Sequence, residues 1–201
     1  MSLTPLTELE AVNLILKNMG EESVSTITGT IALDASEALA TLREVSKQVQ
    51  SRGWWFNTEY QTLAIDGDSK YPLPANTLQV RSAGTDEATP VIARDGFLYN
   101  MTEFEHSLTW TSSTHKVRVV LGLSWDNLPQ VARQYIALRA SRVYQISQLG
   151  DSMNSQDDMK DEVDALATLA QEQMRQNPMS LKDSSSIAAV VASTPTLAVN
   201  A

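Results

Sequence analysis

Apolar residues recur every three or four positions near both ends of this chain, but the spacing is lost across residues 58–124. Such spacing places side chains on one face of an α-helix, so it predicts helices before and after that segment. Within the segment, short β-like runs alternate with turn signals. The order predicts an α+β fold, mainly α: a four-helix bundle with an inserted small antiparallel β-unit and an extended C-terminal tail.

The changes of pattern also set the expected domain boundaries. We predict a helical domain whose first half is residues 1–57 and second half residues 125–178, an inserted β-rich domain at 58–124, and a tail at 179–201. The tail is mostly Ser, Ala, Val and Thr, a composition that rarely builds a core alone. We therefore expect it to be extended.

Two helices are predicted before the insert. Thr7 and Glu10 form a capping box, in which the hydroxyl accepts from the amide three residues on and the carboxylate reaches back. The second helix is expected to begin near Asp34 and to be ended by Gly53. Three large aromatic residues follow at once, and we expect one tryptophan of this group in the core and the other at an interface: Trp54, Trp55, Phe56.

Two more helices are predicted after the insert. The third runs from about Pro129 to Leu149, with Gly150 as its stop, and the fourth from about Ser155 to Gln176. The first turns of the fourth helix are rich in acids, which suit the positive end of the helix dipole. These acids are Asp157, Asp158, Asp161, Glu162 and Asp164.

The insert contains six β-like runs separated by turn signals. They are Tyr60–Ile65, Thr77–Arg81, Pro90–Ala93, Phe97–Asn100, Ser107–Thr111 and Lys116–Leu121. The clearest hairpin signal is the Asp95-Gly96 pair between two apolar runs, because this dipeptide favours the tight two-residue turn.

Composition narrows the classes of function. The formal net charge is -9, whereas proteins that bind DNA phosphates usually carry a basic patch, and this chain is not basic overall. It contains no cysteine, which excludes disulfides and thiolate chemistry. We expect no secretory signal and no membrane span, because no apolar stretch approaches the roughly 20 residues that a span needs.

No motif for catalysis or cofactor binding is found. The zinc-protease, phosphate-loop, dinucleotide and nucleophile-elbow patterns are all absent, so we expect no enzyme activity, no cofactor and no catalytic residue. His106 and His115 make a weak metal signal without clustered cysteines, and no metal site is predicted. The alternative is a tail-associated polysaccharide-degrading hydrolase that uses two carboxylates, for which pairs such as Glu103 and Glu105 are poor evidence.

The segment from Gln48 to Asn57, Q-V-Q-S-R-G-W-W-F-N, resembles a stretch of the tail tubular protein A family. That family is the adaptor, or gatekeeper, of short-tailed bacteriophages (podoviruses). The resemblance extends upstream through Glu10–Asn13 and Met19–Glu21, and returns downstream at Arg133–Ile136 and Arg139–Arg142. The matches follow the family's order and cover most of the helices.

This resemblance implies a structural role in the virion, at the head–tail junction. Family members form a homo-oligomeric ring of twelve copies beneath the portal protein, and the resemblance implies a dodecamer here too. The ring joins the portal to the nozzle made of tail tubular protein B, and tail fibres attach around it. DNA passes through the channel without sequence-specific binding, and the assembled ring gates DNA ejection.

Candidate interface residues follow from the physics of a ring, in which one face of each subunit meets a different face of the next. Basic residues of the third helix, expected off its apolar face, are predicted to meet the acidic first turns of a neighbour's fourth helix. Aromatic residues of the insert are candidate anchors on nozzle or fibre, or else fill the β-core. Apolar tail residues are candidate contacts to the portal or to a neighbour's sheet edge. The three groups are Arg133, Arg139 and Arg142; Phe97, Tyr99, Phe104 and Trp110; and Ile187, Val190 and Val191.

Overall fold

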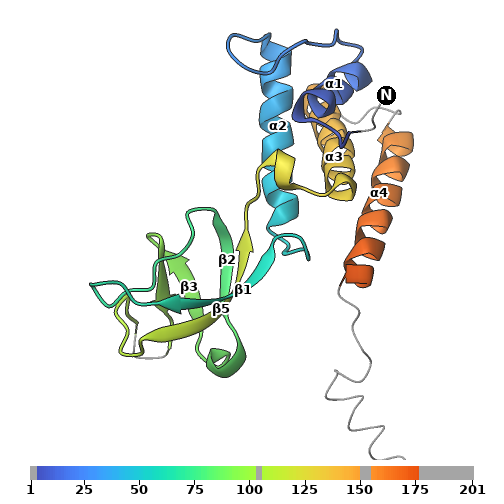
Figure 1. Cartoon of the computed structure of the whole chain (residues 1–201). Helices are drawn as coiled ribbons and strands as arrows, with labels where there is room; N and C mark the ends of the chain where they lie inside the picture. Colours follow the sequence, from blue (N-terminus) through green and yellow to red (C-terminus); the bar gives the residue numbers. More distant parts are fainter. Residues whose placement is uncertain (1–3, 103–105, 150–154, 177–201) are drawn as a thin grey trace, which may run out of the picture.

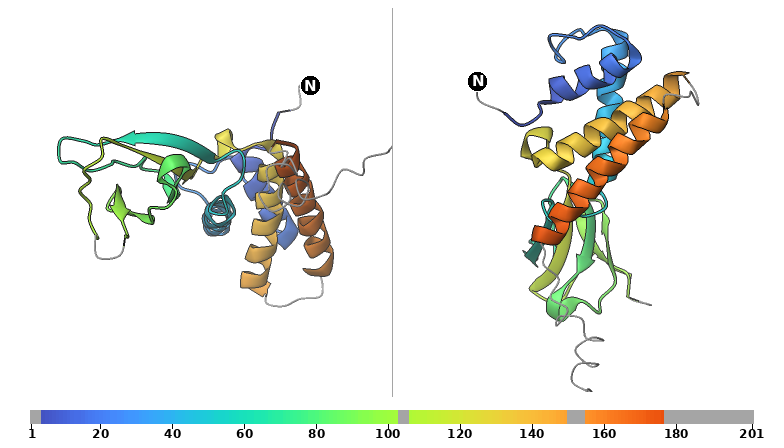
Figure 2. Two further views of the ribbon diagram at one scale, coloured as in Figure 1. Left: turned by 90° about the horizontal axis from the view of Figure 1, so that it is seen from below. Right: turned by 90° about the vertical axis from the view of Figure 1, so that its right-hand side faces the viewer.

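The computed structural model describes residues 4–102, 106–149 and 155–176. The helices gather at one end of the molecule and the strands form a separate unit at the other (Figure 1). Two further views show that the β-unit extends sideways from the helices (Figure 2). The fold is α+β, with four helices and small antiparallel sheets, as the sequence predicts.

The four predicted helices are found as α1 (Glu8–Met19), α2 (Leu33–Gln50), α3 (Gln130–Leu149) and α4 (Ser155–Gln176). The capping box of α1 is confirmed: the amide of Glu10 donates to Thr7 Oγ1 at 3.2 Å and the amide of Thr7 donates to Glu10 Oε2 at 2.8 Å. Gly53 does not end α2, because the helix stops three residues earlier and a turn intervenes. Gly150 lies outside the described residues.

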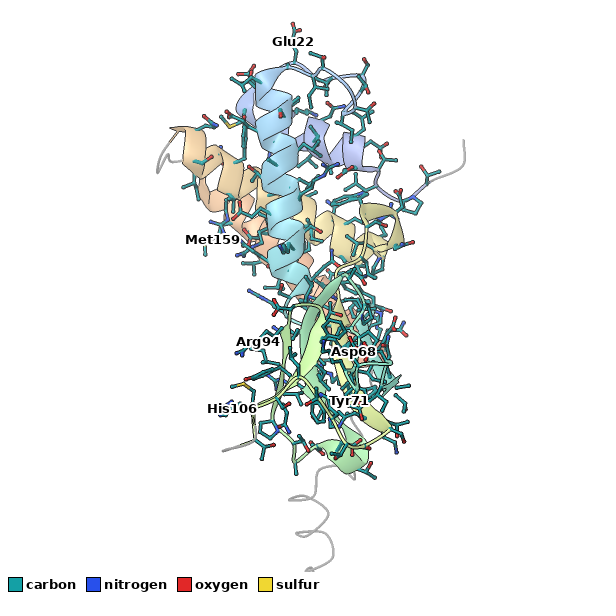
Figure 3. All side chains as sticks on the ribbon, turned by 90° about the vertical axis from the view of Figure 1, so that its left-hand side faces the viewer. Glu22, Asp68, Tyr71, Arg94, His106 and Met159 are labelled. Carbon is teal, nitrogen blue, oxygen red and sulfur yellow. The ribbon has the colours of Figure 1, made fainter. Side chains whose placement is uncertain are left out.

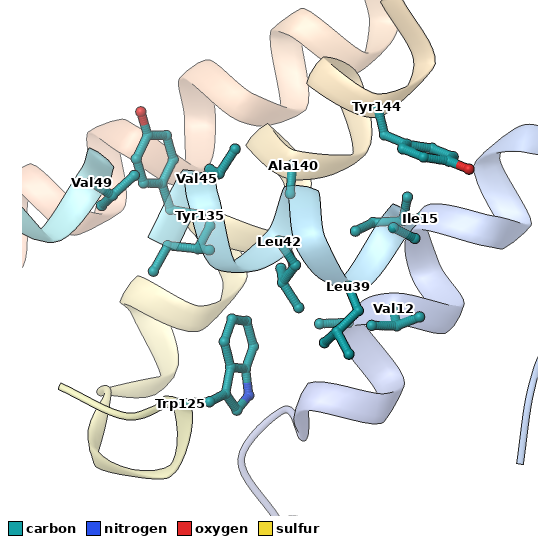
Figure 4. Close-up of a cluster of buried hydrophobic side chains, with 14 of the residues drawn as sticks. Val12, Ile15, Leu39, Leu42, Val45, Val49, Trp125, Tyr135, Ala140 and Tyr144 are labelled. Atoms are coloured by element: carbon teal, nitrogen blue, oxygen red, sulfur yellow. The ribbon is translucent and has the colours of Figure 1, made fainter. Parts of the chain in front are cut away.

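The central helix of this domain is α3, against which α1, α2 and α4 each pack. Figure 4 shows how side chains from α1 and α2 meet those of α3 around Trp125, which precedes α3 in a short 3-10 turn (Trp125–Asn127). The buried cluster labelled there comprises Val12, Ile15, Leu39, Leu42, Val45, Val49, Trp125, Tyr135, Ala140 and Tyr144. Burial of this apolar surface is the main favourable contribution to the stability of the helical part.

The strands all lie between α2 and α3 in the chain. A three-stranded antiparallel sheet has the order β1 (Thr58–Ala64), β5 (Thr114–Leu121), β2 (Thr77–Ser82). Strands β3 (Val91–Arg94) and β4 (Phe97–Asn100) form the predicted hairpin. Its turn residues Asp95 and Gly96 have φ angles of 53° and 81°, which confirms the tight turn read from the dipeptide.

One predicted strand is wrong. The run from Ser107 to Thr111 forms no strand, and within this run only Ser107 makes an isolated bridge, to Asn100. The physical reason is local: Ser107 Oγ accepts from the amide of Thr109 at 3.0 Å, which bends the backbone away from an extended ladder.

A second, smaller core fills the β-unit beneath the three-stranded sheet. It contains Leu63, Tyr71, Val80, Leu98, Val117, Val119 and Leu121. In Figure 3 the side chain of Tyr71 lies within this unit, whereas Arg94 and His106 lie toward its outside. His115 is buried in the same core, where its Nε2 lies 2.9 Å from Ser82 Oγ and its ring packs on Trp110.

The buried imidazole makes a testable contribution to pH dependence. Burial lowers the pKa of His115 from its usual 6.5, and the charge of Asp86 opposes this only partly. The unfolded chain therefore binds the proton more readily, so stability is fully present above pH 6.5 and declines as the pH falls through the lowered pKa. We expect His115→Gln to flatten the difference in urea midpoint between pH 7.5 and pH 5. His106→Gln, at an exposed position, should retain the wild-type difference, and equal slopes for all three proteins would contradict the assignment.

Candidate assembly surfaces

The junction between helices and strands is held by two buried amide side chains. Gln50, the last residue of α2, donates from Nε2 to the carbonyl of Leu123 at 3.1 Å and accepts the amide of Leu123 on Oε1 at 2.7 Å. Asn57 donates from Nδ2 to the carbonyls of Gln50 at 2.9 Å and Leu121 at 2.8 Å. These bonds join the end of α2 to the chain that leaves β5, and thereby couple the two units.

The turn between these amides requires glycine. Gly53 has φ 76°, in the left-handed region that other residues rarely adopt. A Cβ at this position would lie 3.0 Å from Val120 Cγ2 of β5. The φ angle is set by the backbone of the turn and the short Cβ distance by the approach of the turn to the sheet, so the glycine is part of the junction and not a helix stop.

A groove of about 610 Å³ lies beside this turn, between the outer face of the three-stranded sheet and α4. Its floor includes one residue from each strand, Tyr60, Arg118 and Arg81, which are direct neighbours in register. Tyr60 is 76% exposed. Gln173 of α4 and the half-buried Trp55 complete the wall that faces the helices.

The arginines of α3 are engaged within the subunit. Arg133 is 7% exposed and donates to the carbonyls of Leu128, Leu6 and Asp126 at 2.8, 2.9 and 2.8 Å. The prediction that Arg133 lies off the core face of its helix is therefore wrong. Its guanidinium satisfies backbone groups where the segment before α3 crosses the segment before α1.

Arg139 and Arg142 share a single carboxylate. Arg139 Nη1 lies 3.0 Å from Glu162 Oε1, and Arg142 Nε donates to the other oxygen, Oε2. Glu162 is a buried acid of α4, so these two arginines of α3 and this acid of α4 pair within one chain. The sequence pattern predicts this pairing between subunits, whereas in the structure Arg139 and Arg142 meet Glu162 of their own chain.

This pairing predicts a moderate effect on stability. We expect Glu162→Ala to lower the free energy of unfolding by about 2 kcal/mol, because two partly exposed arginines lose their shared partner. Urea unfolding followed by circular dichroism measures it. The matched control is Glu172→Ala on the same helix, whose ion pair with exposed Arg175 should be worth less than about 0.5 kcal/mol. Equal losses for the two variants would contradict the assignment.

The family described as tail tubular protein matches residues 9–179, which cover α1 from its second residue, the other three helices, the β-unit and the junction. The chain belongs to the tail tubular protein family. A protein named tail tubular protein A, from Klebsiella phage KP34, is 31% identical over 149 residues, covering 74% of this chain and 77% of that protein. This tail tubular protein is thus a structural component of a phage tail.

In this family member, the segment from Gln48 to Asn57, which carries the sequence resemblance, forms the junction between helices and strands. Gln50, Gly53 and Asn57 are the residues that shape it. The match to the family model continues to residue 179, so most of the tail lies beyond it.

The candidate aromatic anchors lie in different environments. Trp110 is half-buried in the β-core and donates from Nε1 to the carbonyl of Leu98 at 3.0 Å. Phe97 and Tyr99 are half-buried on β4, each with a cation above its ring: Lys70 at 5.4 Å and Arg94 at 3.9 Å. Phe104 lies outside the described residues.

The two junction tryptophans are both half-buried against the helical core. Trp54 donates from Nε1 to the carbonyl of Val49 at 2.8 Å, and the backbone amide of Trp55 donates to Gln173 Oε1 at 2.9 Å. Trp55 therefore connects the junction to α4 and borders the groove. The candidate tail residues Ile187, Val190 and Val191 lie outside the described residues.

Sequence reasoning did not single out the groove. A signal was available, because Arg118 alternates with Val117 and Val119 along β5, which marks it as facing away from the buried side of the sheet. The alternation does not show which residue of β2 lies opposite. Only the strand register places Arg81 there.

In the described part of the chain, no helix is long and apolar enough to cross a membrane, and no group of three His, Cys, Asp or Glu side chains could hold a metal ion.

Proposed function

We propose that this protein is the head–tail adaptor of its phage, a ring of identical subunits, twelve in number, that joins the portal to the tail nozzle and gates DNA passage. The observation that carries the proposal is the family match over residues 9–179, with the relative named tail tubular protein A. In this assembly the nozzle is tail tubular protein B, tail fibres attach around the ring, and DNA passes without sequence-specific contacts.

Exposed apolar side chains support an assembly role. Val143 and Ile146 of α3 and Met159 and Val163 of α4 are exposed near the connected ends of the two helices, with Met159 at 58%. Figure 3 shows Met159 at the outside of the helical end. Exposed apolar groups on neighbouring helices are typical of protein–protein contact sites. We assign this end of the helix pair to contacts within the assembly.

The β-unit is suited to be an arm, because it projects away from the helices (Figures 1 and 2). Its half-buried Phe97 and Tyr99 could each add contact area at its surface, and we assign them to nozzle or fibre contacts. Trp110 belongs to the core beneath them. Both junction tryptophans line the groove. We assign Trp55, whose backbone amide donates to Gln173 of α4, to the interface, and Trp54, whose indole N–H donates to the carbonyl of Val49, to the core. Ile187, Val190 and Val191 are assigned to contacts with the portal.

The test is the mass of the assembled protein. Native mass spectrometry and light scattering should show a ring of about twelve subunits, either alone or after mixing with the portal protein of the same phage. A chain that stays monomeric under both conditions would contradict the adaptor role. Release of reducing sugar from host capsule by the purified protein, lost on mutation of a defined Glu or Asp, would favour a hydrolase instead.

A further inference from the structure

Two arginines face each other across neighbouring strands in the groove. Arg81 of β2 is the register partner of Arg118 of β5, and Lys116 is exposed two residues before Arg118 on the same side of the strand. Like charges directly opposite one another destabilise a sheet. Among the described residues no acid lies within ion-pair distance of either arginine, although Glu87 also lines the groove. An external anion would relieve this repulsion.

We propose that this basic groove, defined by Arg81 and Arg118 with Tyr60 beside them, receives the carboxylates of Asp161 and Asp164 from α4 of a neighbouring copy of this chain. The inference rests on the ring proposed above and specifies one of its subunit contacts. Each arginine can hold a carboxylate through paired N–H donors, which gives orientation as well as attraction.

Two acids of α4 are suited to this contact because their carboxylates are available to bind another subunit. Glu162 points inward to Arg139 and Arg142, whereas Asp161 and Asp164 are exposed and make no ion pair with any described residue. Their three-residue separation places them on one face of the helix. The acidic first turns predicted from sequence to bind a neighbour thus keep that role, with the sheet as the partner surface.

A subunit cannot fill the groove with its own aspartates. The groove borders α4 at Gln173, nine positions beyond Asp164, which at 1.5 Å per residue is about 14 Å along the helix axis. The acids must therefore come from another copy. A basic surface at one place and an acidic surface at another produce the head-to-tail contact that closes a ring.

The same features argue against DNA as the occupant. Glu87 lines the groove, α4 presents its carboxyl end nearby, and the whole chain carries a net charge of -9. Each of these repels a polyanion. A pair of side-chain carboxylates carries less negative charge than a DNA duplex and is small enough for a groove of about 610 Å³.

A charge-swap experiment tests the contact. In the first variant, Arg81→Glu and Arg118→Glu make the groove acidic; in the second, Asp161→Arg and Asp164→Arg make the α4 surface basic. Each variant alone should need at least about a hundredfold higher concentration to assemble under the wild-type conditions, because like charges then meet at every contact. An equimolar mixture should regain wild-type assembly, since each variant complements the other and the two alternate around the ring.

The control with the same charge change as the groove variant is Lys17→Glu with Lys47→Glu, two exposed positions away from the groove, and it should assemble like the wild type. Circular dichroism and thermal melting establish that each variant is folded. The milder Arg81→Gln with Arg118→Gln removes the opposed charges without adding acids, and it should weaken assembly while leaving the melting temperature unchanged or higher.

The outcomes separate this contact from the adaptor role. If the wild type forms rings and both swap variants do so equally well, the contact is wrong and the adaptor role stands. The contact is equally wrong if the mixture fails to regain assembly. If the groove variant assembles normally but loses binding to duplex DNA in a filter assay, DNA is the occupant. A wild type that never assembles, alone or with portal, overturns both proposals.

Discussion

Replacing Asn57 by alanine is expected to lower the free energy of unfolding by about 3–5 kcal/mol. The side chain is buried and completes three hydrogen bonds: it donates to the carbonyls of Gln50 and Leu121 and accepts the amide of Trp54 at 2.9 Å. Alanine leaves these backbone groups without their partner in a place that water reaches poorly. Because they belong to α2, the turn and β5, the loss weakens the joint between the two units.

Urea unfolding followed by tryptophan fluorescence measures this change. The matched control is Asn76→Ala, which removes an exposed amide that makes one hydrogen bond, to the carbonyl of Gly122 at 3.0 Å, and should cost less than about 1 kcal/mol. Asn57→Asp retains the acceptor but loses both donated bonds, so it should fall near the alanine variant. A loss at Asn57 no larger than at Asn76 would show that the junction is not held by this side chain.

Replacing Arg133 by methionine is expected to cost about 3–4 kcal/mol. The aliphatic part of the guanidinium side chain is replaced at similar volume, so packing is largely retained. The carbonyls of Leu6, Asp126 and Leu128 lose a charged donor, and such bonds are stronger than neutral ones. The segment before α1 should then separate from the start of α3.

Hydrogen exchange at the start of α1, together with urea unfolding, tests this expectation. The control Arg52→Met changes the same residue type at an exposed position in the turn after α2 and should alter stability by less than about 0.5 kcal/mol. If Arg133→Met leaves both stability and exchange at the wild-type level, the guanidinium has no structural role within the subunit. The prediction that Arg133 contacts a neighbouring subunit would then be favoured.

The sequence indicates different amounts about Asn57 and Arg133. Asn57 belongs to the stretch that carries the family resemblance, but the sequence does not show that its side chain bonds three backbone groups. Helical spacing predicts Arg133 off the apolar face of its helix, a position that agrees with how seldom arginine is buried. Three carbonyls from separate segments make burial favourable, and no local pattern reveals that those carbonyls converge.

The amino-acid sequence by itself determined the elements whose causes are local. The Thr7–Glu10 box begins α1, the Asp95-Gly96 pair turns the β3–β4 hairpin, and helical spacing locates four helices. Capping, turn geometry and periodicity involve residues a few positions apart, so they can be read along the chain.

Only the tertiary structure decided which distant residues meet. It turned Glu162 toward Arg139 and Arg142, placed Arg81 opposite Arg118, and required Gly53 where the turn approaches β5. Strand register and helix packing depend on how whole faces fit together, and that fit is a property of the folded chain. The physical reason is that burial and charge pairing act through space between segments that the sequence keeps far apart.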